Sequence, residues 1–188
     1  MDPTRFRSLD ALEAGFATMP GSPADLGALT AVVSRTELGH FANVEPVRLT
    51  PEHGVPGDAW VRKEGATLES QITVMRTGVA QLIANGRPLA VFGDNLFMDL
   101  DLSVENLPPG SRVTIGGSLL EVAAKDHKGC KKFSARFGLD ALRFVSTPQG
   151  RRLRFRGLYL MVVEPGEIAP GDTVTVVERA PAIDEGAV

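Results

Sequence analysis

The chain has 188 residues, 43% hydrophobic and 23% charged, which suits one globular domain with a sizeable core. Its one cysteine excludes an intrachain disulfide, so we expect a reducing, cytoplasmic location rather than secretion. No apolar run approaches the roughly 18 residues that span a bilayer, and the N-terminus lacks the basic and apolar blocks of a signal peptide, so no membrane association is expected.

The first predicted element is a helix over residues 8–19. Leu9, Leu12 and Phe16 recur on one helical face, and Ser8 can cap the first turn. From Leu29 onward the pattern changes to short β-rich runs between glycine and proline turns. Strands are expected over residues 29–36, 44–49, 71–75, 99–104, 112–115, 119–123 and 173–177, with a short helix over 77–85.

The strand spacing predicts a mainly β fold, a distorted and largely closed β-barrel with a few short helices. The clearest hairpin turns at Gly116-Gly117. One further helix is expected between Cys130 and Phe144, where Phe133 and Phe137 recur at helical spacing. We divide the chain into an N-terminal helical extension (1–28), the barrel domain (29–180) and a flexible tail (181–188).

The net charge of −3 conceals an asymmetry. Residues 125–156 contain ten basic and two acidic side chains, a local charge of +8, so the remainder carries −11. Such a local field on an acidic protein suits a specific anionic ligand, although a solvated basic surface explains it equally well. Nucleic-acid binding through this window, with interleaved phenylalanines as stacking rings, is the weakest alternative because the acidic remainder would repel the backbone.

Cys130 is the strongest candidate for chemistry. It follows a predicted strand and begins a predicted helix, and Lys128, Lys131 and Lys132 lie beside it. Helix N-termini and neighbouring cations stabilise a thiolate, which is both a nucleophile and a soft metal ligand. A buried structural cysteine is the competing interpretation, but the surrounding segment is too polar for a core.

Other motifs are less informative by themselves. His127, three residues before Cys130, could pair with the thiol, but loop histidines without a chemical role are commoner. Gly93-Asp94-Asn95-Leu96 and Gly57-Asp58 are typical of turns, whose Asp and Asn could also bind a ligand. Dinucleotide, Walker, nucleophile-elbow and zinc-helix signatures are absent from the sequence.

Four stretches, in order, resemble the MOSC family, named for the C-terminal domain of molybdenum cofactor sulfurases. They span most of the chain, from about Leu29 to Glu178. They are Gly54-Val55-Pro56-Gly57-Asp58 with Arg62; Gly93-Asp94-Asn95-Leu96; Gly110 to Gly116 leading through Leu120-Glu121-Val122 to Gly129-Cys130 and Lys132-Phe133; and Arg156-Gly157-Leu158-Tyr159, followed by Val162-Val163-Glu164, Gly166, Ile168 and Gly171-Asp172.

The resemblance implies a barrel of the pyruvate-kinase type and a role for Cys130 as the family's essential cysteine. Relatives include amidoxime-reducing enzymes, in which the matching cysteine is thought to bind molybdenum, and sulfurases, in which the domain receives or delivers sulfur. The chain departs from the family at Asp94, where glutamate is commoner, and at Gly129, where proline usually precedes the cysteine. The His-Gly-Gly segment that many members carry after Gly-Asp is missing.

The leading hypothesis is a molybdenum-cofactor (molybdopterin) protein that reduces N-hydroxylated compounds, with Cys130 as metal ligand and an electron-transfer partner. Lys131, Lys132, Arg136 and Arg156 are the candidates for the pterin phosphate, and Asp94, Asn95, Tyr159 and Arg62 are the candidates for the pocket. The alternative is a sulfur carrier that takes a persulfide onto Cys130 from a cysteine desulfurase. Pyridoxal phosphate is not expected, because the chain is too short to include the domain that binds it.

Overall fold

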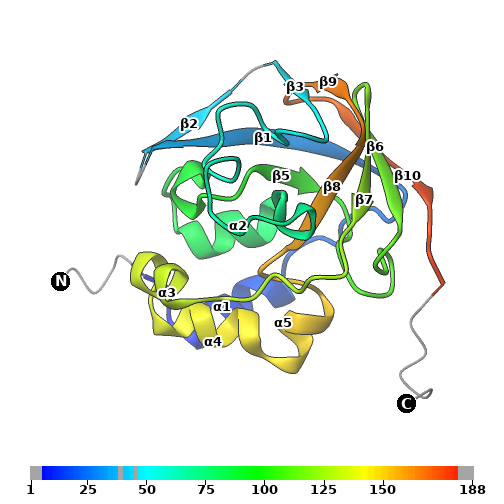
Figure 1. The fold of residues 1–188 in the computed structure, drawn as a ribbon. Coiled ribbons are helices and arrows are strands. Elements are labelled where there is room, and N and C mark those ends of the chain that lie inside the picture. Colours follow the sequence, from blue (N-terminus) through cyan, green and yellow to red (C-terminus); the bar gives the residue numbers. More distant parts are fainter. Residues whose placement is uncertain (1–5, 38–39, 45, 182–188) are drawn as a thin grey trace, which may run out of the picture.

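Seven β-strands close into a barrel in the computed structural model, which describes residues 6–37, 40–44 and 46–181 (Figure 1). Around the ring the order is β1-β10-β6-β7-β8-β4-β5, and the β1–β10 pairing closes it. All neighbours are antiparallel except β4 and β5. The strands are β1 (Leu26–Glu37), β4 (Ile72–Arg76), β5 (Leu96–Asp99), β6 (Arg112–Ile115), β7 (Ser118–Val122), β8 (Leu158–Glu164) and β10 (Thr173–Glu178). The predicted mainly β, closed barrel is confirmed.

Three further strands lie outside this ring. β2 (His40–Asn43) pairs with the second half of β1, and β3 (Val47–Leu49) pairs with β9 (Gly166–Ile168). In β7 the burial alternates along the strand, as a half-buried strand requires, and its inward side chains join the aliphatic barrel core.

A layer of helices packs on one side of the barrel and encloses a second, phenylalanine-rich core (Figure 1). Phe144 and Phe155 stack with ring centroids 4.7 Å apart, and Phe16 lies 4.4 Å from Phe155. The helices are α1 (Leu9–Ala17), α2 (Thr77–Ala84), α3 (Lys131–Phe137), α4 (Leu139–Ser146) and α5 (Pro148–Arg152), with 3-10 turns η1 (Leu68–Ser70) and η2 (Leu89–Phe92). Across the described ranges, no helix has the length and apolar character needed to cross a membrane.

Two predicted elements were wrong. The strand expected over residues 99–104 ends at Asp99, because the alternating leucines that follow, Leu100 and Leu102, fill the barrel core from a turn. The single helix expected from Cys130 to Phe144 is two helices, since Gly138 has φ 90° and breaks the hydrogen-bond ladder between α3 and α4.

The domain division remains a prediction. β1 begins at Leu26, inside the predicted extension, and α1 contributes the buried Leu12 to the phenylalanine-rich core. Of the predicted tail, residues 182–188 lie outside the described residues.

Candidate functional site around Cys130

Cys130 ends an irregular segment, residues 123–130, that leaves β7 and crosses to α3 (Figure 1). The residue is extended (φ −137°, ψ 177°) at the N-terminal cap of α3, and its thiol is free and exposed. Gly129 sits close to α4: a Cβ there would lie 2.5 Å from Cδ1 of Leu142. The glycine found in place of the family's proline therefore allows the segment to approach α4 closely.

A cleft of about 750 Å³ lies beside α3. Its wall combines positive charge with aromatic rings, and no carboxylate of the described residues lines it. The cations are Arg35, Arg62, Lys63, Lys132 and Arg136, and the rings are Phe41, Trp60 and Tyr159. Three of the predicted site residues beyond Cys130 that carry positive charge, Arg62, Lys132 and Arg136, thus share one cleft.

These cations differ in how firmly they are held. Arg62 donates hydrogen bonds to the carbonyl oxygens of Gly57 (3.1 Å), Arg35 and Thr36. Arg136 donates to the carbonyl of Phe92, and its guanidinium lies 5.0 Å from the centroid of the Phe41 ring. Lys132, in contrast, makes no hydrogen bond or ion pair within the described ranges, so its ammonium is available to a ligand.

Asp94 and Arg156 form a buried ion pair behind the cleft. Nη1 of Arg156 donates to both Asp94 carboxylate oxygens, at 3.0 and 2.8 Å, and the carboxylate is fully buried. The guanidinium also lies 5.1 Å from the centroid of the Phe133 ring. The two predicted ligand residues therefore neutralise each other, and Arg156 lines a different cavity from Lys132.

His127 packs against this pair. Its Nε2 is 3.7 Å from Oδ1 of Asp94, and its ring lies 4.5 Å from that of Tyr159. Burial, and then the charges of Arg156 and Arg35, hold the pKa of His127 well below its usual value, so the imidazole is neutral at pH 7. Nδ1 of His127 and Nε of Arg156 are buried without a hydrogen-bond partner in the described part of the chain.

Asn95 is fully buried and does not line the cleft. Its Oδ1 accepts hydrogen bonds from the Thr73 amide (3.1 Å), the Thr73 hydroxyl (2.9 Å) and Arg35 (3.2 Å). Its Nδ2 donates to the Val33 carbonyl and to Oδ2 of Asp58. The amide thus joins β1, β4 and the loop of Asp58, and so supports the cleft wall from behind.

Arg35 and Asp58 were not among the predicted site residues. Nε and Nη2 of Arg35 donate to Asp58 at 2.6–3.1 Å, and the amides of Arg35 and Trp60 donate to the same carboxylate at 2.8 Å. Burial raises the pKa of Asp58, but these bonds and the charge of Arg35 outweigh it and hold that pKa below its usual value. The sequence signal was the Asp58-to-Arg62 spacing. Arg35 gave none, because it lies at the polar end of a strand and belongs to no motif.

Tyr159 connects the cleft to the Cys130 segment. It lines the cleft, and Lys125 Nζ lies 5.9 Å from the centroid of its ring. Burial raises the pKa of its phenol, with smaller contributions from several charges that include the nearby Cys130. The phenol is therefore protonated at neutral pH and can donate a hydrogen bond into the cleft.

The predicted site residues thus fall into four places. Cys130 is exposed at the start of α3, while Arg62, Lys132, Arg136 and Tyr159 line the cleft, Asp94 and Asn95 are buried behind it, and Arg156 lines a second cavity. Lys131 is exposed beside Cys130 at the start of α3, and neither residue lines the cleft or the second cavity. Within the described ranges, no group of three or more His, Cys, Asp or Glu side chains is placed to hold a metal ion.

Comparisons with known proteins agree with the fold. A family model described as the MOSC domain matches residues 68–175. The YuaD protein from Bacillus subtilis is similar in structure, with TM-score 0.59, 16% identity and coverage of 79% of this chain and 94% of its own. YiiM from Escherichia coli has a TM-score of 0.57 and 18% identity, with coverage of 81% of this chain and 71% of its own. YiiM from Geobacillus stearothermophilus has a TM-score of 0.57 and 19% identity, with coverage of 81% of this chain and 76% of its own. Among curated proteins, none matches the sequence.

Proposed function

The chain belongs to the MOSC domain family, and we propose that it binds the molybdenum cofactor with the Cys130 thiolate as a ligand of the metal. The observation that carries this proposal is a free, exposed thiol two residues before Lys132, which lines a cationic cleft. We further propose that the cofactor-loaded protein reduces N-hydroxylated compounds and works in the cytoplasm.

The size, charge and aromatic lining of the cleft support this proposal. Its volume of about 750 Å³ lies within the range of small-molecule sites, roughly 300–1,000 Å³. Lys132 and Arg136 would hold the phosphate through charge-assisted bonds, and Arg62 would add to the positive field. The Trp60 and Phe41 rings give apolar surface for a flat heterocycle.

In this proposal the protein binds the cofactor and orients the substrate, and the metal supplies the redox chemistry. Cys130 would be the single protein ligand of the metal, with the others coming from the cofactor. The Tyr159 phenol, protonated at neutral pH like other phenols, would orient a polar substrate group by donating a hydrogen bond. Electrons would come from a separate redox protein.

The test is the molybdenum and pterin content of protein purified from a host that makes the cofactor. We expect roughly one of each per chain, retained in Lys131→Ala, reduced in Lys132→Ala and lost in Cys130→Ala. Lys131 is the matched control, because it neighbours Lys132 but does not line the cleft. Cofactor content equal in wild type and Cys130→Ala would refute the ligand role.

The exposure of Cys130 favours one alternative, a sulfur carrier. The Cys130 thiolate would attack the outer sulfur of a cysteine desulfurase persulfide, the desulfurase thiolate would leave, and Cys130 would then carry the persulfide. Incubation with a desulfurase and cysteine should add one sulfur, about 32 Da, to Cys130. An unchanged intact mass, with a desulfurase shown to be active on another acceptor, would argue against a carrier.

A further inference from the structure

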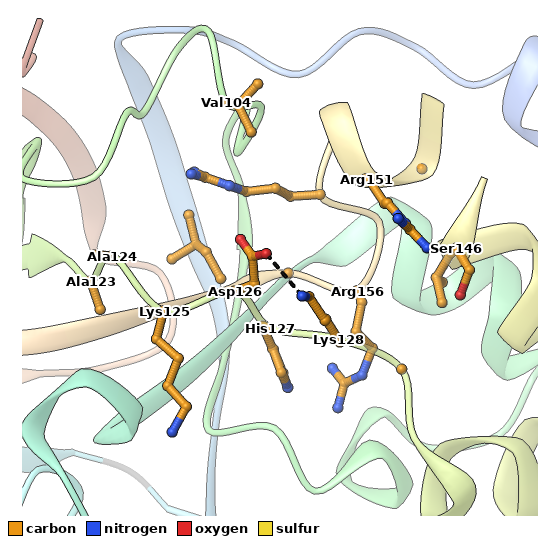
Figure 2. Close-up of a pocket in the computed structure, with 16 residues that line it drawn as sticks. Val104, Ala123, Ala124, Lys125, Asp126, His127, Lys128, Ser146, Arg151 and Arg156 are labelled. Atoms are coloured by element: carbon orange, nitrogen blue, oxygen red, sulfur yellow. Dashed lines mark ion pairs between the residues drawn. The ribbon is translucent and has the colours of Figure 1, made fainter. Parts of the chain in front are cut away.

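A second cavity, of about 260 Å³, is lined by most of the segment that leads to Cys130 (Figure 2). Its walls are residues 123–129, the end of α4, part of α5, Val104, Arg154 and residues 156–158 leading into β8. It shares no lining residue with the cleft. The cavity is therefore a separate space whose wall includes most of the segment that positions the thiol.

The wall of this cavity is positive even when Arg156, which Asp94 neutralises, is left out. The lining cations are Lys125, Lys128, Arg151, Arg154 and Arg156, and the one lining acid is Asp126. Asp126 already pairs with Lys128 at 3.3 Å, the pair drawn in Figure 2, and both side chains are about three-quarters exposed. Since such exposed pairs are weak, Lys128 can turn to a ligand at little cost.

Arg154 is held in place by part of its guanidinium only. Its Nη1 donates to the carbonyl oxygens of Leu102 (3.2 Å) and Leu107 (2.7 Å), whereas Nε and Nη2 make no hydrogen bond within the described ranges. Nη2 of Arg156 and all the guanidinium nitrogens of Arg151 likewise make no hydrogen bond within the described ranges. Arg154 and Arg156 are thus anchored with donors unused, whereas Arg151 is exposed and unanchored. Guanidinium groups with unused donors are suited to oxyanions, because two parallel N–H groups match two oxygens.

The backbone that carries the two arginines is unusual. Arg154 has φ 49°, a left-handed conformation that side chains rarely adopt, and Gly157 has φ 92°. A Cβ on Gly157 would lie 1.7 Å from the carbonyl oxygen of Val74, so no other residue fits. Strained backbone of this kind is frequent at ligand clamps, and here it fixes where Arg154 and Arg156 leave the chain.

From these observations we infer that the cavity binds a small oxyanion of the phosphate class. Its volume is below the usual range for drug-sized ligands, which favours inorganic phosphate or one phosphate group of a larger molecule. A ligand here would contact the segment 123–129 and so fix the position of Cys130 relative to Tyr159. The inference stands on the cavity alone and does not require the proposed function.

The probe is inorganic phosphate, titrated into cofactor-free, ¹⁵N-labelled protein while amide resonances are followed. The amides of Gly129, Gly150 and Gly157 report on the cavity, because all three line it. We expect saturable shifts at these glycines, with the dissociation constant raised about tenfold in Arg151→Ala, the usual effect of losing one charge-assisted bond. Arg152→Ala is the matched control, since Arg152 is the next residue of α5 and does not line the cavity.

Two results would overturn the inference. If Arg152→Ala weakens binding as much as Arg151→Ala, phosphate senses only the general field of the surface. If Lys132→Ala abolishes binding while Arg151→Ala does not, phosphate binds in the cleft instead. Retained binding in cofactor-loaded protein would identify a free oxyanion as the ligand, whereas binding blocked by the cofactor, with less cofactor in Arg151→Ala, would identify the cofactor's phosphate.

Discussion

The buried imidazole of His127 makes stability depend on pH. Because its pKa in the fold is well below 6.5, the unfolded chain binds a proton below pH 6.5 that the folded chain does not. The contribution of His127 to the free energy of unfolding is fully present above pH 6.5. It declines as pH falls toward the lower pKa that His127 has in the folded state. We expect the free energy of unfolding, measured with urea, to fall from about pH 7.5 to about pH 5, by at most about 1.4 kcal/mol per pH unit.

The variant His127→Gln should lower stability at pH 7.5 yet flatten this pH dependence, because glutamine does not titrate. His53→Gln is the control, since His53 is an exposed loop residue bonded to Thr50. The pH range of this experiment stays above the range in which Asp58 titrates, because the pKa of Asp58 is below its usual 3.8. A slope unchanged by His127→Gln would show that other groups cause the dependence.

Asn95 is the residue whose loss should affect the cleft wall most widely. Asn95→Ala removes the side-chain hydrogen bonds to Thr73, to the Val33 carbonyl and to Asp58, all in a buried setting, so we expect a loss of about 2–4 kcal/mol in urea unfolding. Asn43→Ala, at an exposed position of β2, should change stability by less than about 0.5 kcal/mol. Equal effects of the two variants would contradict the network.

At the scale of elements, two glycines with similar φ angles distinguish two costs of adding a side chain. One cost is backbone strain, and the other is collision with a neighbouring strand. Gly157 (φ 92°) meets the Val74 carbonyl, whereas a Cβ on Gly171 (φ 97°) would meet nothing within 4 Å. Gly171→Ala should therefore cost about 1–2 kcal/mol from conformation alone, and Gly157→Ala more than about 3 kcal/mol, because β4 and β8 must separate. Thermal and urea unfolding of the two variants, compared directly, would refute this explanation if the costs were equal.

Elements were predictable where local patterns decide them. The Ser8 cap and the hairpin at Gly116-Gly117 depend on neighbouring residues, and both are present. The prediction of a strand over 99–104 was wrong because the alternation of apolar and polar residues indicates which side chains are buried, not which backbone groups pair. The Gly138 break was missed because one glycine within a helical pattern is often tolerated.

The same limit applies to the site. Cys130 and the nearby cations were predictable, since their chemistry is local to one stretch of sequence. The Arg35–Asp58 pair and the division of the basic residues between two cavities depend on contacts between distant strands and loops. No local pattern encodes those contacts, so only the closed barrel reveals them.

At the scale of the whole molecule, α1 belongs to the fold's second core. Leu12 is buried in that core and Phe16 contacts Phe144 and Phe155. Leu12→Ala should therefore cost about 2–5 kcal/mol in urea unfolding, as for other buried leucines. Leu26→Ala, at a leucine 60% exposed, is the control and should be nearly neutral. A small effect of Leu12→Ala would mean that the helix is a dispensable extension.

Closure of the barrel depends on strands from opposite ends of the chain. Leu26, Gly27 and Ala28 of β1 pair with residues 173–175 of β10, about 150 positions later. On the ribosome, β1 therefore has no closing partner until β10 has been synthesised. We expect the nascent barrel to expose an open edge during that interval, in which chaperones would protect it and aggregation would threaten it most.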